Sequence, residues 1–188
     1  MSTPATHRHA LPAAWRFDGF EALDACHRET LRMLEQLAAL LRRLDETGTD
    51  SQARAMAAAI ARHFSITVRQ HHEDEELHVF PALAATADPA TRHAIECLRQ
   101  DHFWLDADWR ELSPLIEAVS HGLSCPDIEG LRHGADVFGL LCHDHIVLEE
   151  SLIYPQACAN MPDVARRTMD REMAARRREV RGRPAASH

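Results

Sequence analysis

The residues best suited to chemistry lie in two related segments, residues 64–81 and residues 138–155. The segments align without a gap at an offset of 74 residues and share the pattern Phe-x6-His-x3-Glu-Glu-x2-[Val/Ile]-[Phe/Tyr]-Pro. On a helix, side chains four positions apart lie on one face, about one turn above each other. Each segment would therefore present an imidazole and a carboxylate to the same side, which outlines half of a metal site. These side chains are His71 and Glu75 in the first segment and His145 and Glu149 in the second.

The register of the first segment decides which of its two adjacent histidines faces inward. His71 is favoured because Phe64, seven residues earlier, belongs to the apolar stripe, whereas the residue seven before His72 is a serine. The second segment agrees, since Ile146 takes the place equivalent to His72. Charged groups are usually solvated, so the other acidic side chains of the segment are expected to face outward or to orient the ligands. These are Glu73, Asp74 and Glu76.

Two further histidines, His27 and His102, each interrupt a leucine-rich apolar stripe elsewhere in the chain. A single histidine of this kind is more often a core residue that hydrogen-bonds to a neighbour than a ligand. The intervals favour the ligand interpretation, because His27 precedes His71 by 44 residues and His102 precedes His145 by 43. A helix, a short turn and a returning helix bring the chain back to about the same height. All six groups are therefore predicted to meet at one level of the fold.

Four long amphipathic segments must position these side chains. The first begins at a capping residue, Asp18, and ends at Gly48, and the second begins at Asp50 or Ser51. The third is expected to kink or divide at Pro114. Long helices joined by short connections predict an all-α fold, an up-down-up-down antiparallel four-helix bundle. The four segments cover about residues 18–46, 51–80, 88–120 and 126–155.

Length and composition are those of one globular domain. The chain has 188 residues, and its seven glycines and abundant Ala, Leu, Glu and Arg favour helix over sheet. We expect a flexible segment over residues 1–17, the bundle over residues 18–157, and an arginine-rich C-terminal segment over residues 158–188. The five cysteines are odd in number and include no Cys-x2-Cys pair, which argues against disulfides and a thiolate zinc site. We expect them to be reduced and mostly buried.

Charge and hydropathy restrict the partners. The net charge of −8 argues against binding of nucleic acid. The sequence contains no eighteen-residue apolar run and no apolar core of a signal peptide, so no membrane association is expected and the cytoplasm is the predicted location.

The C-terminal segment predicts a short fifth helix from Pro162 to about Val180. Its arginines lie at positions 166, 167, 171, 176, 177, 178, 181 and 183. Three interpretations remain open: a solvated helix with interspersed acids, a frayed tail, or a surface that docks an acidic protein partner.

A cation would solve the energetic problem that the six groups create. Desolvating an unpaired carboxylate costs several kcal/mol, which is of the order of the whole stability of a small domain. Two divalent ions would offset the carboxylate charge and satisfy the imidazole lone pairs. A set of four His and two Glu suits two iron ions, with manganese or zinc as substitutes. The candidates for orienting the imidazoles are Asp24, Thr67, Asp101 and Asp106.

Coordination numbers indicate what such a centre could bind. If each glutamate bridges and each ion takes two histidines, each ion has about four protein ligands. Six-coordinate iron then keeps open positions for an oxo or hydroxo bridge and for a small diatomic molecule or peroxide.

The pattern resembles the hemerythrin-like HHE cation-binding family. The resemblance covers about residues 18–157 and implies a non-haem di-iron centre with bridging carboxylates in a four-helix bundle. Its specific parts are His27, His71-x3-Glu75-Glu76, His102 and His145-x3-Glu149-Glu150, with Phe-Pro81 and Tyr-Pro155 after the two Glu-Glu pairs.

The chain departs from the oxygen-carrying members that it resembles. Those proteins have a fifth histidine, in a His-x3-His pair on the third helix, where this chain has Asp106. They also end the ligand set with Asp, where this chain has Glu149. The four-His, two-Glu set is more similar to bacterial di-iron proteins linked to nitrosative stress and iron–sulfur cluster repair. Those proteins carry a Cys-containing N-terminal domain, whereas residues 1–17 contain no Cys.

Three functions fit these observations. The first is a di-iron protein that binds or senses O2, NO or iron. The second is an oxidoreductase that consumes peroxide or NO, or that takes part in iron–sulfur cluster repair. The third is a scaffold in which the metal only stabilises the fold. The sequence has no glycine-rich loop for a flavin or nicotinamide donor, which favours binding or sensing.

Overall fold

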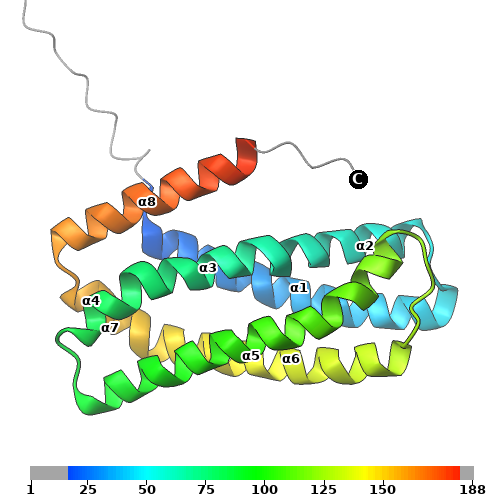
Figure 1. The fold of residues 1–188 in the computed structure, drawn as a ribbon, viewed down its shortest axis with the longest axis horizontal. Coiled ribbons are helices and arrows are strands. Elements are labelled where there is room, and N and C mark those ends of the chain that lie inside the picture. The colour runs from blue at the N-terminus through cyan, green and yellow to red at the C-terminus, as the bar shows by residue number, and fades with distance from the viewer. Residues whose placement is uncertain (1–16, 183–188) are drawn as a thin grey trace, which may run out of the picture.

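Four long helical rods lie side by side in the computed structural model, which describes residues 17–182 and the side chains of residues 17–178 (Figure 1). The predicted flexible segment 1–17 thus falls, apart from Phe17, outside the described residues. The first rod is α1 (Gly19–Thr47), and the third is α5 (Pro89–Ser120). The second rod consists of α2 (Ser51–Arg62), the π-helical segment η2 (His63–Val68), α3 (Arg69–Asp74), the π-helical segment η3 (Glu75–Val79) and α4 (Phe80–Ala84). The fourth rod consists of α6 (Ile128–Leu148), the π-helical segment η4 (Glu149–Ile153) and α7 (Tyr154–Asn160). A last helix, α8 (Asp163–Gly182), follows.

Successive rods run in opposite directions, as the colours of Figure 1 show. The first rod packs against α2 and α6, and α5 packs against α2 and α6 as well, so the rods form a closed ring of four. The predicted all-α bundle is confirmed. None of the described helices combines the length and the apolar character needed to cross a membrane.

Aspartates begin the rods, as the sequence predicts. The carboxylates of Asp18, Asp50, Asp88 and Asp127 each accept a hydrogen bond from the backbone N–H three residues later, which satisfies one of the free donors of the first turn. Gly48 ends α1 with a φ of 70°, in the region that favours glycine.

Proline interrupts the rods less than expected. The sequence analysis expected Pro114 to kink or divide the third helix, and the helix is not divided there, because α5 continues to Ser120. The second rod also continues past Pro81 to Ala84, four residues beyond the predicted end. Pro81 and Pro155 each directly follow the first residue after a π-helical segment, η3 or η4. A proline ring crowds the carbonyl four residues earlier, and that carbonyl lies inside the wider π turn, which accommodates the proline in both rods.

The core consists of two apolar clusters with a polar layer between them. One cluster includes Leu37, Leu40, Ile60 and Phe138. The other includes Leu23, Phe80, Leu98 and Ile153 towards the opposite end of the rods. All of these side chains are buried. Hydrophobic burial at both ends therefore holds the four rods together around the polar layer.

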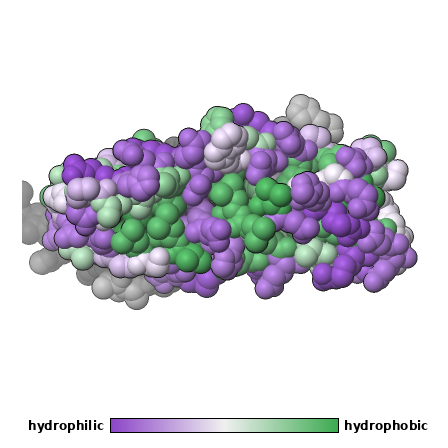
Figure 2. All heavy atoms as spheres, turned by 90° about the horizontal axis from the view of Figure 1, so that it is seen from below, coloured by the Kyte–Doolittle hydropathy of each residue, from purple (hydrophilic) through white to green (hydrophobic). Residues whose placement is uncertain are grey.

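The surface over α5 and α6 carries apolar side chains among polar ones. Seen from the side of these helices, two apolar areas lie between hydrophilic residues (Figure 2). The exposed large hydrophobic residues of α5 and α6 are Phe103, Trp104, Val137, Leu140 and Val147.

The predicted fifth helix exists, and it packs on the bundle rather than lying free in solvent. In α8, Met169 and Met173 are completely buried against the start of α1. A Cβ at Gly19 would lie 2.6 Å from Cε of Met169, so glycine permits this close approach. The Gly19 N–H donates a hydrogen bond of 2.8 Å to Oδ1 of Asp170. Over its described residues, this helix is therefore packed on the bundle through one face and is not a frayed tail.

Two arginines of α8 bind an aspartate that the sequence analysis expected at the surface or beside the ligands. Asp74 is 1% exposed, because Arg176 donates to Oδ1 at 2.8 Å and Arg177 donates to Oδ2 at 2.7 Å. The expectation for Asp74 was wrong because its partners come from a helix a hundred residues further along the chain. Other arginines of α8, Arg167 and Arg171, are exposed, and an acidic protein partner for them stays a prediction.

We predict that replacing both partners of Asp74 destabilises the bundle. The double substitution Arg176→Met and Arg177→Met leaves a buried carboxylate uncompensated, which costs about 3 kcal/mol. Chemical denaturation of the metal-free protein measures this loss. Adding Asp74→Asn should restore most of the stability, and the matched control Arg167→Met with Arg171→Met should change it little. Equal effects of the two double substitutions would contradict the anchoring role.

Candidate metal centre

All six predicted side chains meet in the polar layer between the two apolar clusters. They come from every rod, and each is at most 8% exposed. The six are His27 on α1, His71 on α3, Glu75 at the start of η3, His102 on α5, His145 on α6 and Glu149 at the start of η4. The sequence interpretation that places four histidines and two glutamates at one level therefore agrees with the structure.

One half of the layer contains His27 and His71 with both glutamates. The Nε2 atoms of the two histidines are 3.0 Å apart. Nε2 of His27 lies 3.1 Å from Oε2 of Glu149, and Nε2 of His71 lies 3.4 Å from Oε2 of Glu75. One ligand atom from each of the four residues falls within 4.8 Å of all the others. This spacing is suitable for one metal ion.

The other half contains His102 and His145 with the same two glutamates. Nε2 of His145 lies 3.2 Å from Oε1 of Glu149, and Nε2 of His102 lies 3.4 Å from Oε2 of Glu75. These four residues again place one ligand atom each within 4.8 Å of the others. Glu149 thus directs Oε2 to one pair of histidines and Oε1 to the other. Both carboxylates belong to both groups, which is the arrangement of a bridged pair of ions.

The ligand atoms lack other partners, so the residues fit a metal. Five inward atoms are buried without a hydrogen bond: Oε2 of Glu75, Nε2 of His102, Nε2 of His145 and both carboxylate oxygens of Glu149. Buried polar groups are nearly always paired, and a cation at each position would satisfy these lone pairs. Burial lowers the pKa of His71 to about 3, which keeps its imidazole in the neutral form that binds metals. Burial and the Glu75 carboxylate raise the pKa of Glu149 well above its usual value, and a cation would oppose this shift.

Comparison with known proteins agrees with the geometry. The family model described as the hemerythrin HHE cation binding domain matches residues 18–157. The chain belongs to this family. It is also 33% identical over 141 residues to an uncharacterized protein of Haemophilus influenzae, an alignment that covers 74% of this chain and 78% of that one. The HHE domain therefore binds cations, and the layer described above is its candidate site.

The second glutamate of each Glu-Glu pair orients a histidine of the HHE domain. Glu76 Oε1 lies 3.1 Å from Nδ1 of His102, and Glu150 Oε1 lies 3.0 Å from Nδ1 of His27. Each contact turns Nε2 of the imidazole towards the centre, as the outer partners of metal ligands commonly do. The sequence analysis left Glu76 between an outward and an orienting role, and the structure assigns it the orienting one.

Of the four residues that were predicted to orient the imidazoles, one lies near a ligand histidine as expected and three do not. Asp101 Oδ2 lies 3.6 Å from Nδ1 of His145, close to the expected role but too long for a hydrogen bond. The prediction was wrong for Asp24 and Asp106, because each pairs one turn later on its own helix, with Arg28 and Arg110 respectively. It was also wrong for Thr67, which is exposed. The helical spacing of Asp24 and Asp106 from the ligands did not show that an arginine on the same helix would bind each carboxylate instead.

Tyr154 is a residue of the centre that the sequence analysis missed. Its hydroxyl donates a hydrogen bond of 2.5 Å to Oε1 of Glu75 and lies 3.3 Å from Nε2 of His27. Its ring stacks on His27, and Phe80, at the equivalent place in the first segment, stacks on His102. The difference between Phe and Tyr in the aligned segments was the available signal. The hydroxyl makes the two halves of the centre unequal.

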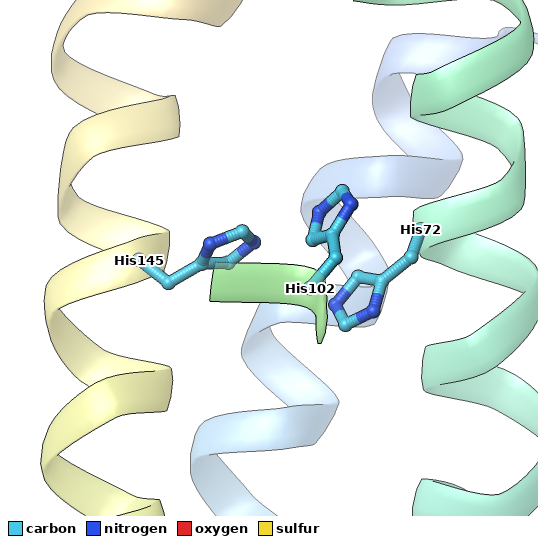
Figure 3. Close-up of side chains that lie close together, drawn as sticks. All are labelled: His72, His102 and His145. Atoms are coloured by element: carbon cyan, nitrogen blue, oxygen red, sulfur yellow. The ribbon is translucent and has the colours of Figure 1, made fainter. Parts of the chain in front are cut away.

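A cavity of about 420 Å³ adjoins the four ligand histidines. Its walls are largely apolar and include Phe64, Leu105, Trp109 and Phe138. His72 also lines it, close to His102 and His145 (Figure 3). The cavity can therefore admit a small molecule to the centre from the side of His72.

The cysteines and the surface histidine stay apart from the site. All five cysteines are free, as expected, but only Cys26 and Cys142 are buried, so the expectation that most are buried was wrong. His143, on the same helix as His145, is exposed. No cysteine sulfur takes part in the groups that could hold a metal among the described residues.

We predict that the orienting glutamates control metal affinity. Glu76→Ala and Glu150→Ala should each weaken metal binding by about 10- to 100-fold, since loss of an outer partner has this effect on other metal sites. Competition with a chromophoric chelator measures the affinity. Glu73→Ala is the matched control, because Glu73 is half exposed and pairs only with Arg69. An affinity as high in both variants as in the control would contradict the orienting role.

A fifth buried histidine, His63, gives a prediction for acid stability. Its Nε2 lies 2.8 Å from the Thr30 hydroxyl, and burial lowers its pKa to about 4, while the charge of Glu29 opposes and that of Arg32 assists the shift. The unfolded chain takes up this proton near pH 6.5, whereas the folded chain does not. Stability should therefore fall as the pH decreases from 7 to 5, by roughly 1–2 kcal/mol from this residue.

The variant His63→Gln tests the contribution of His63 to the loss of stability in acid. It keeps a hydrogen-bonding group for Thr30 but cannot titrate, so it should lose less stability between pH 7 and pH 5 than the wild-type protein. Denaturant unfolding of both metal-free proteins at the two pH values gives the comparison. Equal losses in both proteins would show that His63 does not carry the effect.

Proposed function

We propose that this HHE domain holds two iron ions and uses the pair to bind or sense a small molecule, a diatomic gas or peroxide. The observation that carries the proposal is that two groups of ligands share Glu75 and Glu149. One mononuclear ion would leave the inward Nε2 atoms of either His27 and His71 or His102 and His145 without a cation. The ligands of this centre would be His27, His71, Glu75, His102, His145 and Glu149.

The donor set supports iron over a purely structural zinc ion. It combines imidazoles and carboxylates without a thiolate, and the free cysteine sulfurs lie outside it. Structural zinc sites usually contain cysteine and are complete with four ligands at one ion. Nitrogen and carboxylate ligands suit first-row ions in general, so manganese or zinc could replace iron. A pair of iron ions, when bound, would supply reversible binding and electron exchange with a small oxidant.

The chain prepares the site for such a ligand in two ways. The apolar walls of the cavity, among them Trp109 and Phe138, favour a small uncharged molecule. The bundle also fixes the ligands before any metal arrives, since Glu76, Glu150 and Tyr154 already hold them by hydrogen bonds. Both features support binding of a ligand within a rigid site.

Metal analysis with absorption spectroscopy tests the proposal. Protein purified in air should contain about two irons per chain and absorb in the near ultraviolet, and this absorption should change on addition of NO or azide. Glu149→Ala should lose the second ion, because it removes a shared ligand. A ratio near one, or zinc alone without any spectral response, would contradict the proposal and favour a structural metal.

Turnover separates binding from catalysis. We expect a stoichiometric spectral change without repeated consumption of peroxide or NO when a general reductant is added. Repeated consumption that disappears in Glu75→Ala and Glu149→Ala would show instead that the protein is an oxidoreductase at the same centre.

A further inference from the structure

His72 lies outside the six proposed ligands, yet its imidazole is in contact with two of them. Its ring stacks on that of His102 with centroids 4.0 Å apart and an interplanar angle of 14°. The His145 ring lies 5.5 Å from it, edge to face. One nitrogen from each of the three histidines falls within 4.8 Å of the other two, and the three side chains converge from three rods (Figure 3).

We propose that His72 is a fifth imidazole ligand and binds the ion that His102 and His145 hold. The inference rests on the dinuclear centre proposed above and assigns one more residue to it. Metal–nitrogen bonds of about 2.1 Å place two nitrogens on one ion roughly 3–4 Å apart. The present spread of at most 4.8 Å exceeds this by about 1 Å, which a tilt of the His72 ring out of its stack on His102 can supply.

The surroundings of His72 leave its nitrogens available for a metal. Among the described residues, other buried or half-buried histidines have polar partners: His63 has the Thr30 hydroxyl and His78 has Arg176. None of the hydrogen bonds of the described side chains involves His72, and its ring lines the cavity beside the centre. Burial and the neighbouring imidazoles also favour its neutral form, the form that binds metals.

Only one of the two aligned segments provides this extra ligand. The residue equivalent to His72 in the second segment is Ile146, which is buried and has no ligand atom. One position of the centre would therefore have three imidazoles, and the position of His27 and His71 would have two. The second position would have fewer protein ligands, and the Tyr154 hydroxyl lies there, 3.3 Å from Nε2 of His27.

Proton NMR of the cobalt(II)-substituted protein counts the histidine ligands directly. Each imidazole bound to the paramagnetic ion gives one strongly shifted N–H resonance that disappears in heavy water. We expect five such resonances in the wild-type protein and four in His72→Ile. This variant copies the residue found at the equivalent place in the second segment. His143→Ile, at an exposed position, should retain all five.

Release of metal to a chelator gives a second measurement that does not depend on proton exchange. His72→Ile should lose one of its two ions at least about tenfold faster than the wild-type protein, since a direct ligand should matter no less than an outer partner. His143→Ile should release both at the wild-type rates. Circular dichroism of each metal-free variant checks that the bundle is folded.

The outcomes separate this inference from the proposed function. Four shifted resonances in both the wild-type protein and His72→Ile, with equal rates of metal release, would overturn the role of His72 and leave the dinuclear centre standing. No shifted histidine resonance in the cobalt-loaded wild-type protein would overturn the centre, and the inference with it.

Discussion

Two glutamates buried at the middle of the bundle impose the main constraint on this structure. A carboxylate without a partner in the interior is strongly unfavourable, so each oxygen of Glu75 and Glu149 must face a donor or a cation. The four histidines provide the nearest partners, and the Tyr154 hydroxyl holds the one oxygen of Glu75 that points away from them. The apolar clusters then enclose the layer from both ends of the rods. The arrangement of the rods follows from the need to bring these groups to one height.

The fold and the inward side chains were predictable because local rules determine both. Capping aspartates and helical spacing give the rods, and the short turns return the chain to the same height. The repeated His-x3-Glu pattern then identifies the two carboxylates, and the phase of the apolar stripe selects His71. None of these steps needs a contact between residues far apart in the chain.

The errors concern contacts that the sequence does not encode locally. Asp74 is buried because α8 returns to the bundle, and Tyr154 reaches Glu75 only when the second and fourth rods face each other across the core. The wrong expectations for Asp24 and Asp106 have the opposite origin, since an arginine on the same helix binds each of them at the surface. Orientation of metal ligands therefore depends on competition between partners, which periodicity cannot resolve.

The aligned segments also produce equivalent contacts in space. Glu76 holds His102 as Glu150 holds His27, and Phe80 covers His102 as Tyr154 covers His27.

Each half of the bundle is thus a helical hairpin that brings two imidazoles and one carboxylate to a shared axis. Two separate copies of one such hairpin, related by a two-fold rotation, would build the same ligand set as a homodimer. When the two copies are joined in one chain, their sequences no longer have to be identical, so each half can change without the other. The pairs His72/Ile146 and Phe80/Tyr154 are two places where the halves differ, and a pair of identical halves would have two equivalent sets of ligands.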